Sequence, residues 1–509
     1  MDIQKILTSP AVSGAMMRYL PPSFFERIGE KRALKTFRRA AKEVPAYAMF
    51  LEERGINAAD IRTLDDFRTR VPIMDKAAYL RRYPLADRVS GGSFRDRSFT
   101  VFSSSGSSGH VTYWPQESIE LERMVGIVGG LIADMFHLRY KHTLVVNTLA
   151  LGMWSAGRSV LRLFDDMAED KKHYKVVSVT PGLNLEDALG AIRDLGPLFD
   201  QVLLCGYPPF LKKLMDEGER RGLDWKRYNI SFVMGGELVS ESLREDFAEK
   251  AGFSLDAGSL ERVWSLYASS DGIVTPETRL SVAIRRAAAE NPRLAEALFG
   301  TAAPLPSLVQ CAPMNAYLEP HEDGFLFTRW SSVPVIRYDI HDRGGIIPFT
   351  RALEIIGDFG LTPKILADTF GYADMPLQPF PFLYVFGRQD ALKVAGANVF
   401  VDHVAAALED ERIRDLVTGL FTMEKRGAGE SHGRLVIRVE IRKDYEPDAA
   451  METRIGRTLV DALASINSEF RSAISGNPEE ATPVIELVRQ GDDVFLGGNI
   501  KNKFLIAQK

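Results

Sequence analysis

Seven consecutive serine and glycine residues, at positions 103–109, form the segment whose residue types most directly suggest chemistry. They follow a short β-rich run, so hydroxyl and amide donors would gather in a loop after a strand. Glycine lets the backbone approach an anion closely and serine adds hydrogen bonds, which suits phosphate. A flexible linker has the same composition. The Gly-x-x-x-x-Gly-Lys-Ser/Thr pattern of the common triphosphatase loop is absent, and both interpretations stay open.

Five further strings contain residues that could bind a ligand, and each alone also has a plain structural interpretation. Gly235 and Gly236 could form only a turn, Tyr267 could be a core aromatic, Asp342 a cap, and Lys501 a solvated lysine. The order of the strings along the chain is more informative than any one of them. They are MGGELVSESLRE (234–245), SLYASSDG (265–272), PVIRYDIHD (334–342), FGRQDALKVAGANVF (386–400) and GGNIKNKF (497–504).

Other catalytic chemistries have little support in the sequence. The eight histidines are scattered and form no metal-binding or Ser/His/Asp pattern. Cys205 and Cys311 lie in unrelated contexts without metal-ligand spacing, and we expect both to be buried apolar side chains. This cysteine usage fits a reducing cytoplasm.

The elements that must position these strings alternate between short β-rich runs and helix-length segments, which predicts an α/β fold. Residues 24–43 begin a helical entry region in the first hundred residues. The β-rich runs that follow are TVFSSS (100–105), TLVVNTLA (143–150), YKVVSVT (174–180), FDQVLLCG (199–206) and ISFVMGG (230–236).

The character of the chain changes near Gly387, where a loop rich in glycine and charge begins. A strand RLVIRVEIR (434–442), a helical run over 451–475 and a strand VIELVRQ (484–490) follow. These elements predict a compact second α/β domain of about 120 residues. The expected domains are 1–387 and 388–509.

Composition argues against nucleic-acid and membrane-spanning proteins. Lys plus Arg number 63 and Asp plus Glu number 68, so the net charge of −5 gives no general attraction for nucleic acid. The longest apolar stretch, residues 124–138, contains Asp134 and three glycines and is shorter than the ~20 apolar residues that a spanning helix needs. The N-terminal stretch is too polar for a signal peptide, so we expect a cytoplasmic protein without a membrane span.

Taken in order, the strings resemble the adenylate-forming superfamily of acyl-CoA synthetases, and more closely its phenylacetate-CoA ligase branch, from about Val44 to Lys503. The resemblance implies an α/β fold with a large multi-sheet N-terminal domain that binds ATP and the acid, and a small mobile α/β C-terminal domain. It implies ATP-dependent activation of a carboxylic acid to an acyl-adenylate, release of pyrophosphate, and transfer of the acyl group to coenzyme A. The implied cofactors are ATP, Mg²⁺ and coenzyme A.

The resemblance also implies roles for residues in each string. The loop that holds the ATP phosphates would comprise Ser104, Ser105, Gly106, Ser107, Ser108 and Gly109. The segment against the adenine would comprise Gly235, Gly236 and Glu237. The tyrosine motif would comprise Tyr267, which stacks on adenine, then Ala268, Ser269 and Ser270, and Asp271, which helps to hold Mg²⁺. Asp342 would bind the ribose hydroxyls and Arg388 the nucleotide, with Asp390 as the hinge.

Three positions depart from the family's patterns. Where the phosphate loop usually ends in Gly-Lys-Pro, this chain has Gly109, His110 and Val111, so one cationic phosphate contact is replaced. The tyrosine motif usually ends in glutamate, whereas Asp271 is one methylene shorter and still offers oxygen ligands to Mg²⁺. The catalytic lysine would be Lys501 or Lys503, with Lys501 favoured, although neither follows a glycine directly.

The acid and its acceptor are less well defined. Met153 and Trp154 fall where similar enzymes have the wall of the acyl pocket, which suggests an aromatic or apolar acid, although both could be core residues. The partners would be a small carboxylic acid and a thiol acceptor. Two alternatives stay open: an adenylating ligase that uses an amine, a carrier protein or another nucleophile, and a non-catalytic nucleotide-binding homologue. The oligomeric state is also open, a homodimer among the alternatives.

Overall fold

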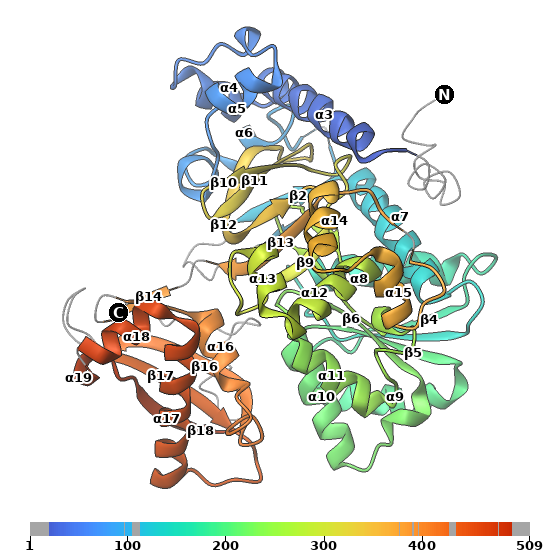
Figure 1. Ribbon diagram of the computed structural model, residues 1–509. Coiled ribbons are helices and arrows are strands. Elements are labelled where there is room, and N and C mark those ends of the chain that lie inside the picture. The colour runs from blue at the N-terminus through green and yellow to red at the C-terminus, as the bar shows by residue number, and fades with distance from the viewer. Residues whose placement is uncertain are drawn as a thin grey trace. The chain divides into compact units, whose positions relative to one another are not determined.

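The computed structural model describes residues 20–490, apart from 96, 104–111, 376, 389–390, 395–396, 427–433 and 477. The chain divides into two compact units, Met1–Val385 and Phe386–Lys509, which we call the large unit and the small unit (Figure 1). The predicted α/β class is confirmed, because each unit combines sheets with helices. The predicted mobility of the C-terminal domain stays a prediction.

The N-terminal helices of the large unit follow the expected amphipathic pattern. They are α3 (Pro22–Glu43), α4 (Pro45–Glu52), α5 (Leu64–Arg70) and α6 (Leu85–Arg88). Along α3 the buried residues recur at helical spacing, for example Ala33, Phe37 and Ala40. The helix ends where Val44, the residue before Pro45, takes an extended conformation, as steric crowding by proline requires.

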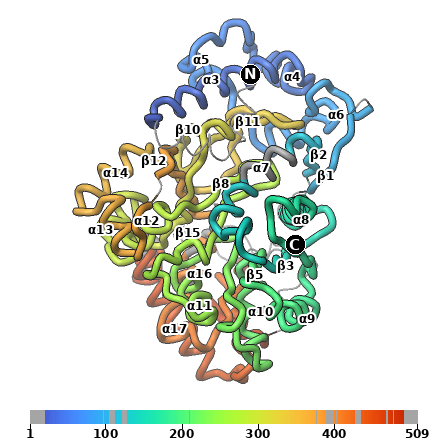
Figure 2. The backbone as a smooth tube through the Cα atoms, turned by 90° about the vertical axis from the view of Figure 1, so that its right-hand side faces the viewer, coloured from blue at the N-terminus to red at the C-terminus, as the bar shows by residue number. Residues whose placement is uncertain are grey.

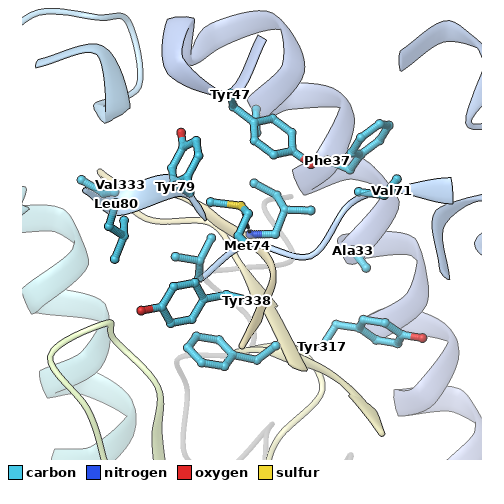
Figure 3. Close-up of a cluster of buried hydrophobic side chains, with 14 of the residues drawn as sticks. Ala33, Phe37, Tyr47, Val71, Met74, Tyr79, Leu80, Tyr317, Val333 and Tyr338 are labelled. Carbon is cyan, nitrogen blue, oxygen red and sulfur yellow. Dashed lines mark hydrogen bonds between the residues drawn. The ribbon is translucent and has the colours of Figure 1, made fainter. Parts of the chain in front are cut away.

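These helices bury their apolar faces against a five-stranded sheet with the order β10-β11-β12-β13-β9. Figure 3 shows this core, in which Phe37 and Tyr47 from the helices lie above Met74 and Tyr338. Met74 also bonds to the sheet, since its amide donates to the carbonyl of Arg337 at 3.1 Å. The strands are β9 (Ser307–Gln310), β10 (Tyr317–His321), β11 (Gly324–Arg329), β12 (Val335–Ile347) and β13 (Phe382–Arg388).

A six-stranded sheet with the order β4-β3-β5-β6-β7-β8 forms the second layer of the large unit. Its first five strands are parallel and β8 is antiparallel to β7. The predicted runs at 143–150, 174–180, 199–206 and 230–236 are confirmed as strands of this sheet. The strands are β3 (Thr143–Asn147), β4 (Val176–Val179), β5 (Gln201–Gly206), β6 (Ile230–Gly235), β7 (Val263–Ala268) and β8 (Val274–Pro276).

Helices cover both faces of this sheet, which explains why β3, β5 and most of β6 are continuously buried. Side chains of α7 (Ser118–Met135) and α8 (Ser155–Glu169) pack with Val145 and Leu203 on one face. On the other face Phe232 stacks on Phe247 of α11 (Glu241–Ala251), with 4.6 Å between ring centroids. In Figure 2, α9 (Leu185–Leu195) and α10 (Pro208–Arg220) lie side by side next to this sheet. The remaining helices of the large unit are α12 (Arg279–Glu290), α13 (Pro292–Phe299), α14 (Phe349–Asp358) and α15 (Pro363–Thr369).

The small unit has its own apolar core beneath a three-stranded sheet with the order β16-β17-β18. Its predicted strands at 434–442 and 484–490 are confirmed. The expected helical run over 451–475 is two helices, because Asn467 takes an extended conformation and its Oδ1 accepts a hydrogen bond from the amide of Phe470 at 3.0 Å. The elements are β14 (Ala391–Val394), β15 (Ala397–Phe400), α16 (Val401–Leu408), β16 (Val417–Arg426), β17 (Arg434–Ile441), α17 (Ala449–Ile466), α18 (Ser468–Gly476), α19 (Pro478–Ala481) and β18 (Val484–Arg489).

Two further predictions about the chain are tested by these elements. Cys205 and Cys311 are both free and buried, as expected, and burial raises the pKa of the Cys311 thiol to about 12. Among the helices of the described residues, none is long and apolar enough to cross a membrane.

Candidate active site

The carboxyl ends of the parallel strands bring several predicted residues to one edge of the six-stranded sheet. The chain runs from β3 to β4 on one side of β3 and then returns to β5 on the other side. Such a reversal marks the place where ligands bind in open α/β sheets. The strand register sets Gly206 beside Met234 and Gly235 beside Leu266, so the residues that follow β5, β6 and β7 emerge close together.

Gly236 and Glu237 follow β6 directly and contact the residue that follows β5. The φ angle of Gly236 is 93°, a conformation that glycine adopts without strain. Its backbone lies against the ring of Tyr207, because a Cβ placed on Gly236 would be 3.5 Å from Cδ2 of Tyr207. The Tyr207 hydroxyl donates a hydrogen bond to Oε1 of Glu237 at 2.7 Å. An exposed glycine backbone flanked by an aromatic ring and a carboxylate can accommodate a planar ring with polar edges.

Tyr267 and Asp342 meet although 75 residues separate them in the sequence. The hydroxyl of Tyr267, on β7, donates to Oδ2 of Asp342, on β12, at 2.7 Å. Both residues are partly exposed, and the Tyr267 ring also makes an edge contact with Phe325 at 6.1 Å between centroids. The bond joins the two sheets of the large unit.

Irregular pairing along β12 determines which way Asp342 faces. Leu326 pairs with Asp339, yet Gly324 pairs with Arg343, so β12 has three residues between these pairs where β11 has one. His341, within this bulge, has a φ angle of 62°. Bulges of this kind redirect side chains and occur often beside active sites.

Asp271 lies in a tight turn between β7 and β8 and is only 4% exposed. The turn is closed by hydrogen bonds of 3.0 Å from the Gly272 amide to the Ser269 carbonyl, and from the Ser269 amide to the Ile273 carbonyl. The buried Ser269 hydroxyl has no hydrogen-bond partner within the described part of the chain. No group of three or more His, Cys, Asp or Glu residues able to hold a metal is found among the described residues.

The start of the serine-glycine loop contacts the predicted wall of the acid pocket. The Ser103 amide donates to the Met153 carbonyl at 2.8 Å, and Ser103 forms an isolated parallel bridge with Trp154. The Met153 side chain is 48% exposed and Trp154 is partly exposed directly before α8. Neither residue belongs to the apolar core, which was the alternative interpretation from sequence.

A buried ion-pair network lies behind this edge and ties β7 to α11. Nη2 of Arg244 and Oε1 of Glu277 are 2.7 Å apart, and both side chains are almost fully buried. Glu277 also accepts a hydrogen bond from the Ser265 amide on β7 at 2.9 Å. Burial raises the pKa of Glu277, and the nearby Arg244 opposes this shift.

Several predicted residues lie outside the described residues. They are Ser104, Ser105, Gly106, Ser107, Ser108, Gly109, Asp390, Lys501 and Lys503. Arg388 is the last residue of β13, but its side chain also lies outside the description. Their assigned roles stay predictions.

Comparison with solved structures identifies the fold. The chain is similar to 2-hydroxyisobutyryl-CoA ligase in the postadenylation state in complex with 2-HIB-AMP, with a TM-score of 0.65 and 14% sequence identity over 97% of this chain and 92% of that one. This protein has the fold of the adenylate-forming acyl-CoA ligases. The fold that the resemblance implies is thereby confirmed. The same ligase in the thioesterification state, in complex with 2-HIB-AMP and CoA, gives a TM-score of 0.53 and 14% identity over 97% and 91% of the two chains.

A curated relative supports the ligase fold from sequence. Phenylacetate-coenzyme A ligase from Thermus thermophilus is 25% identical to this chain over 244 residues, which are 46% of this chain. The match spans about half the length of that relative, 49%. No protein-family model matches the chain.

Two contacts at the site of this ligase fold were not predicted from sequence. Tyr207 was missed because the sequence analysis interpreted only the run before it, residues 199–206, as a strand. The first residue after a parallel strand is nevertheless a usual place for ligand contacts. Arg329 was also missed. It ends β11 next to the Asp271 turn, and no local pattern around it indicates a ligand.

Proposed function

We propose that this protein activates a carboxylic acid, apolar or aromatic, as an acyl-adenylate at the expense of ATP, and then transfers the acyl group to the thiol of coenzyme A. The observation that carries the proposal is the Tyr267–Asp342 hydrogen bond at the edge where Gly236 and Glu237 follow β6. These are the residues to which the family resemblance gives adenine and ribose contacts. Their convergence from three separate segments of the chain supports a nucleoside site.

In the proposed adenylation, a carboxylate oxygen of the acid attacks the α-phosphorus of ATP. The bond from that phosphorus to the bridging oxygen breaks, and pyrophosphate leaves. Gly236 and Tyr267 would contact the adenine, while Asp342, oriented by Tyr267, would accept hydrogen bonds from the ribose hydroxyls. This arrangement would fix the α-phosphate relative to the acid, and fixed orientation of two reactants lowers the barrier substantially.

Two anions must approach each other in this step, so positive charge is needed at the phosphates. When bound, Mg²⁺ would neutralise phosphate charge, and the buried Asp271 carboxylate would be its protein ligand. Lys501 or Lys503 would supply a further cation. The reaction needs no protein nucleophile, because the acid itself attacks.

In the proposed second half-reaction the coenzyme A thiol, as its thiolate, attacks the acyl carbon of the mixed anhydride. AMP leaves and a thioester forms. Met153 and Trp154 would contact the acyl group, next to the start of the serine-glycine loop. An acid with an apolar or aromatic body suits these two side chains.

Exchange of labelled pyrophosphate into ATP tests the first half of the proposal. A broad panel of carboxylic acids, from short aliphatic to aromatic, is supplied one at a time with Mg²⁺. At least one acid is expected to stimulate exchange well above the acid-free rate. If none does while ATP still binds, the protein is a nucleotide-binding homologue without this activity.

Mass spectrometry of the products tests the acceptor. With the acid identified by exchange, incubation with coenzyme A is expected to give an acyl thioester and AMP, and hydroxylamine alone should give the hydroxamate. An adenylate that persists beside coenzyme A and yet reacts with an amine or a carrier protein would replace the thiol transfer by the alternative ligase.

A further inference from the structure

Arg329 reaches from one sheet of the large unit to the Asp271 turn of the other. It is the last residue of β11, where the pairing with β12 shifts between Phe327 and Arg329. Its guanidinium lies against the backbone of Gly272, since a Cβ placed on Gly272 would overlap Nη1 of Arg329. The φ angle of Gly272 is 94°, so both conformation and space favour glycine here. The positive charge therefore sits directly beside the residue that follows Asp271.

The surroundings of Arg329 leave its hydrogen-bond donors available. Glu120 of α7 is the carboxylate that interacts with it electrostatically, and burial still lowers the pKa of the guanidinium. One oxygen of Glu120 accepts a hydrogen bond from the Ser332 hydroxyl. The backbone of Arg329 pairs with Val335 of β12, whereas its guanidinium makes no hydrogen bond to another described residue. A guanidinium has five N–H donors, and its planar fork matches two oxygens of a phosphate group.

A second polar group at the same turn has no partner among the residues that the structure describes. The Ser269 hydroxyl is buried and unpaired among the described residues, and an unpaired buried hydroxyl is costly unless a ligand or water completes it. The sequence adds a third observation. His110 and Val111 stand where the phosphate loop of similar ligases has lysine and proline.

From these observations we infer that Arg329 binds phosphoryl oxygens of ATP at the Asp271 turn and supplies the positive charge that the serine-glycine loop lacks. The inference rests on the proposed function. It assigns a phosphate contact to the last residue of β11, which lies outside every string that the resemblance gives to the nucleotide.

Substitution of Arg329 tests the inference by comparing a ligand that carries the triphosphate with one that lacks it. Binding of Mg-ATP and of adenosine is measured by titration calorimetry for the wild type, Arg329→Gln, Arg329→Lys and the control Arg351→Gln. Arg351 is an exposed arginine on α14 paired with Glu354. We expect Arg329→Gln to weaken the binding of ATP about 10- to 100-fold, the range for a charged hydrogen bond, and to leave the affinity for adenosine unchanged. Arg329→Lys should recover part of the loss, and Arg351→Gln should resemble the wild type.

The inference is overturned if Arg329→Gln binds ATP as tightly as the wild type. It is also overturned if the substitution weakens the binding of ATP and of adenosine equally, which is the effect expected when an arginine has only a structural role. If a variant fails to fold, a measurement on the wild-type protein still tests the inference. Phenylglyoxal modification of Arg329, followed by peptide mass spectrometry, should be prevented by ATP and not by adenosine, and absence of protection by ATP would overturn the inference. Failure of the proposed function is distinguishable, because it appears as absent pyrophosphate exchange in the wild type.

Discussion

At the scale of residues, one hydrogen bond connects Tyr267 and Asp342. The resemblance gives Tyr267 a contact with the adenine and Asp342 a contact with the ribose of the same nucleoside. Tyr267 holds Oδ2 of Asp342 at 2.7 Å, so the position of the carboxylate depends on the tyrosine hydroxyl. The tyrosine ring would remain available for stacking without that hydroxyl. The two functions proposed for Tyr267, stacking and orienting, can therefore be separated by substitution.

Asp342→Asn is expected to weaken the binding of ATP about tenfold or more, because hydrogen bonds from ribose hydroxyls to a carboxylate are stronger than those to an amide. Binding of 2′,3′-dideoxy-ATP should hardly change, since it lacks both hydroxyls. Tyr267→Phe should show a smaller effect in the same direction, about three- to tenfold. Titration of the three proteins with both nucleotides measures these differences. Equal weakening of both nucleotides by Asp342→Asn would contradict a role in binding the ribose.

At the scale of elements, strands and helices were largely predictable because their signals are local. The apolar runs that became β3, β5 and β6 are each complete within a few residues. The bulge that contains His341 was not predictable, because it depends on how β12 pairs with β11. The same limit applies to the Tyr207–Glu237 hydrogen bond, which exists only once β5 and β6 are neighbours.

The break at Asn467 has a different explanation. Residues on both sides of it favour helix, and an extended conformation at one residue, supported by a side-chain bond to the Phe470 amide, separates α17 from α18. The site predictions were most useful where several strings had to converge. The predictions assigned Gly236, Tyr267 and Asp342 to one fold, but they did not indicate which of these residues contact one another.

The buried ion pair behind β7 should be essential to the stability of the large unit. Glu277→Gln leaves Arg244 without its closest counter-charge in a water-excluded place, so we expect the free energy of unfolding to fall by about 3 kcal/mol or more. Glu354→Gln breaks an exposed ion pair with Arg351 and should change the free energy of unfolding by less than about 0.5 kcal/mol. Urea denaturation of both variants beside the wild type provides the comparison, and similar small effects would show that the buried pair contributes little.

At the scale of the whole molecule, the residues proposed for nucleoside binding and those proposed for catalysis belong to different units. Gly236, Tyr267 and Asp342 lie in the large unit, which ends at Val385. Lys501 and Lys503 belong to the small unit by sequence. Binding of ATP and its chemical activation should therefore respond to different substitutions.

Lys501→Ala is expected to retain ATP binding and to lower the rate of pyrophosphate exchange by about 10² to 10³, the loss typical of one preorganised charge contact. Lys503→Ala, two residues away, is the matched control and should keep most of the activity. Exchange rates and ATP titrations on both variants decide between the lysines. Full exchange activity in Lys501→Ala with loss in Lys503→Ala would transfer the role to Lys503.

The bulge in β12 also governs how this chain can be aligned with, or rebuilt from, its relatives. Side chains alternate between the two faces of a strand, so removal of one residue between Asp339 and Arg343 would turn every following side chain to the opposite face. Removal of two residues would regularise the pairing with β11 and restore the alternation, yet it would delete the segment that directs Asp342 toward Tyr267. In a sequence alignment, a gap of odd length in this stretch would therefore match Asp342 to a residue on the opposite face of the strand. This would happen even where the flanking residues are identical.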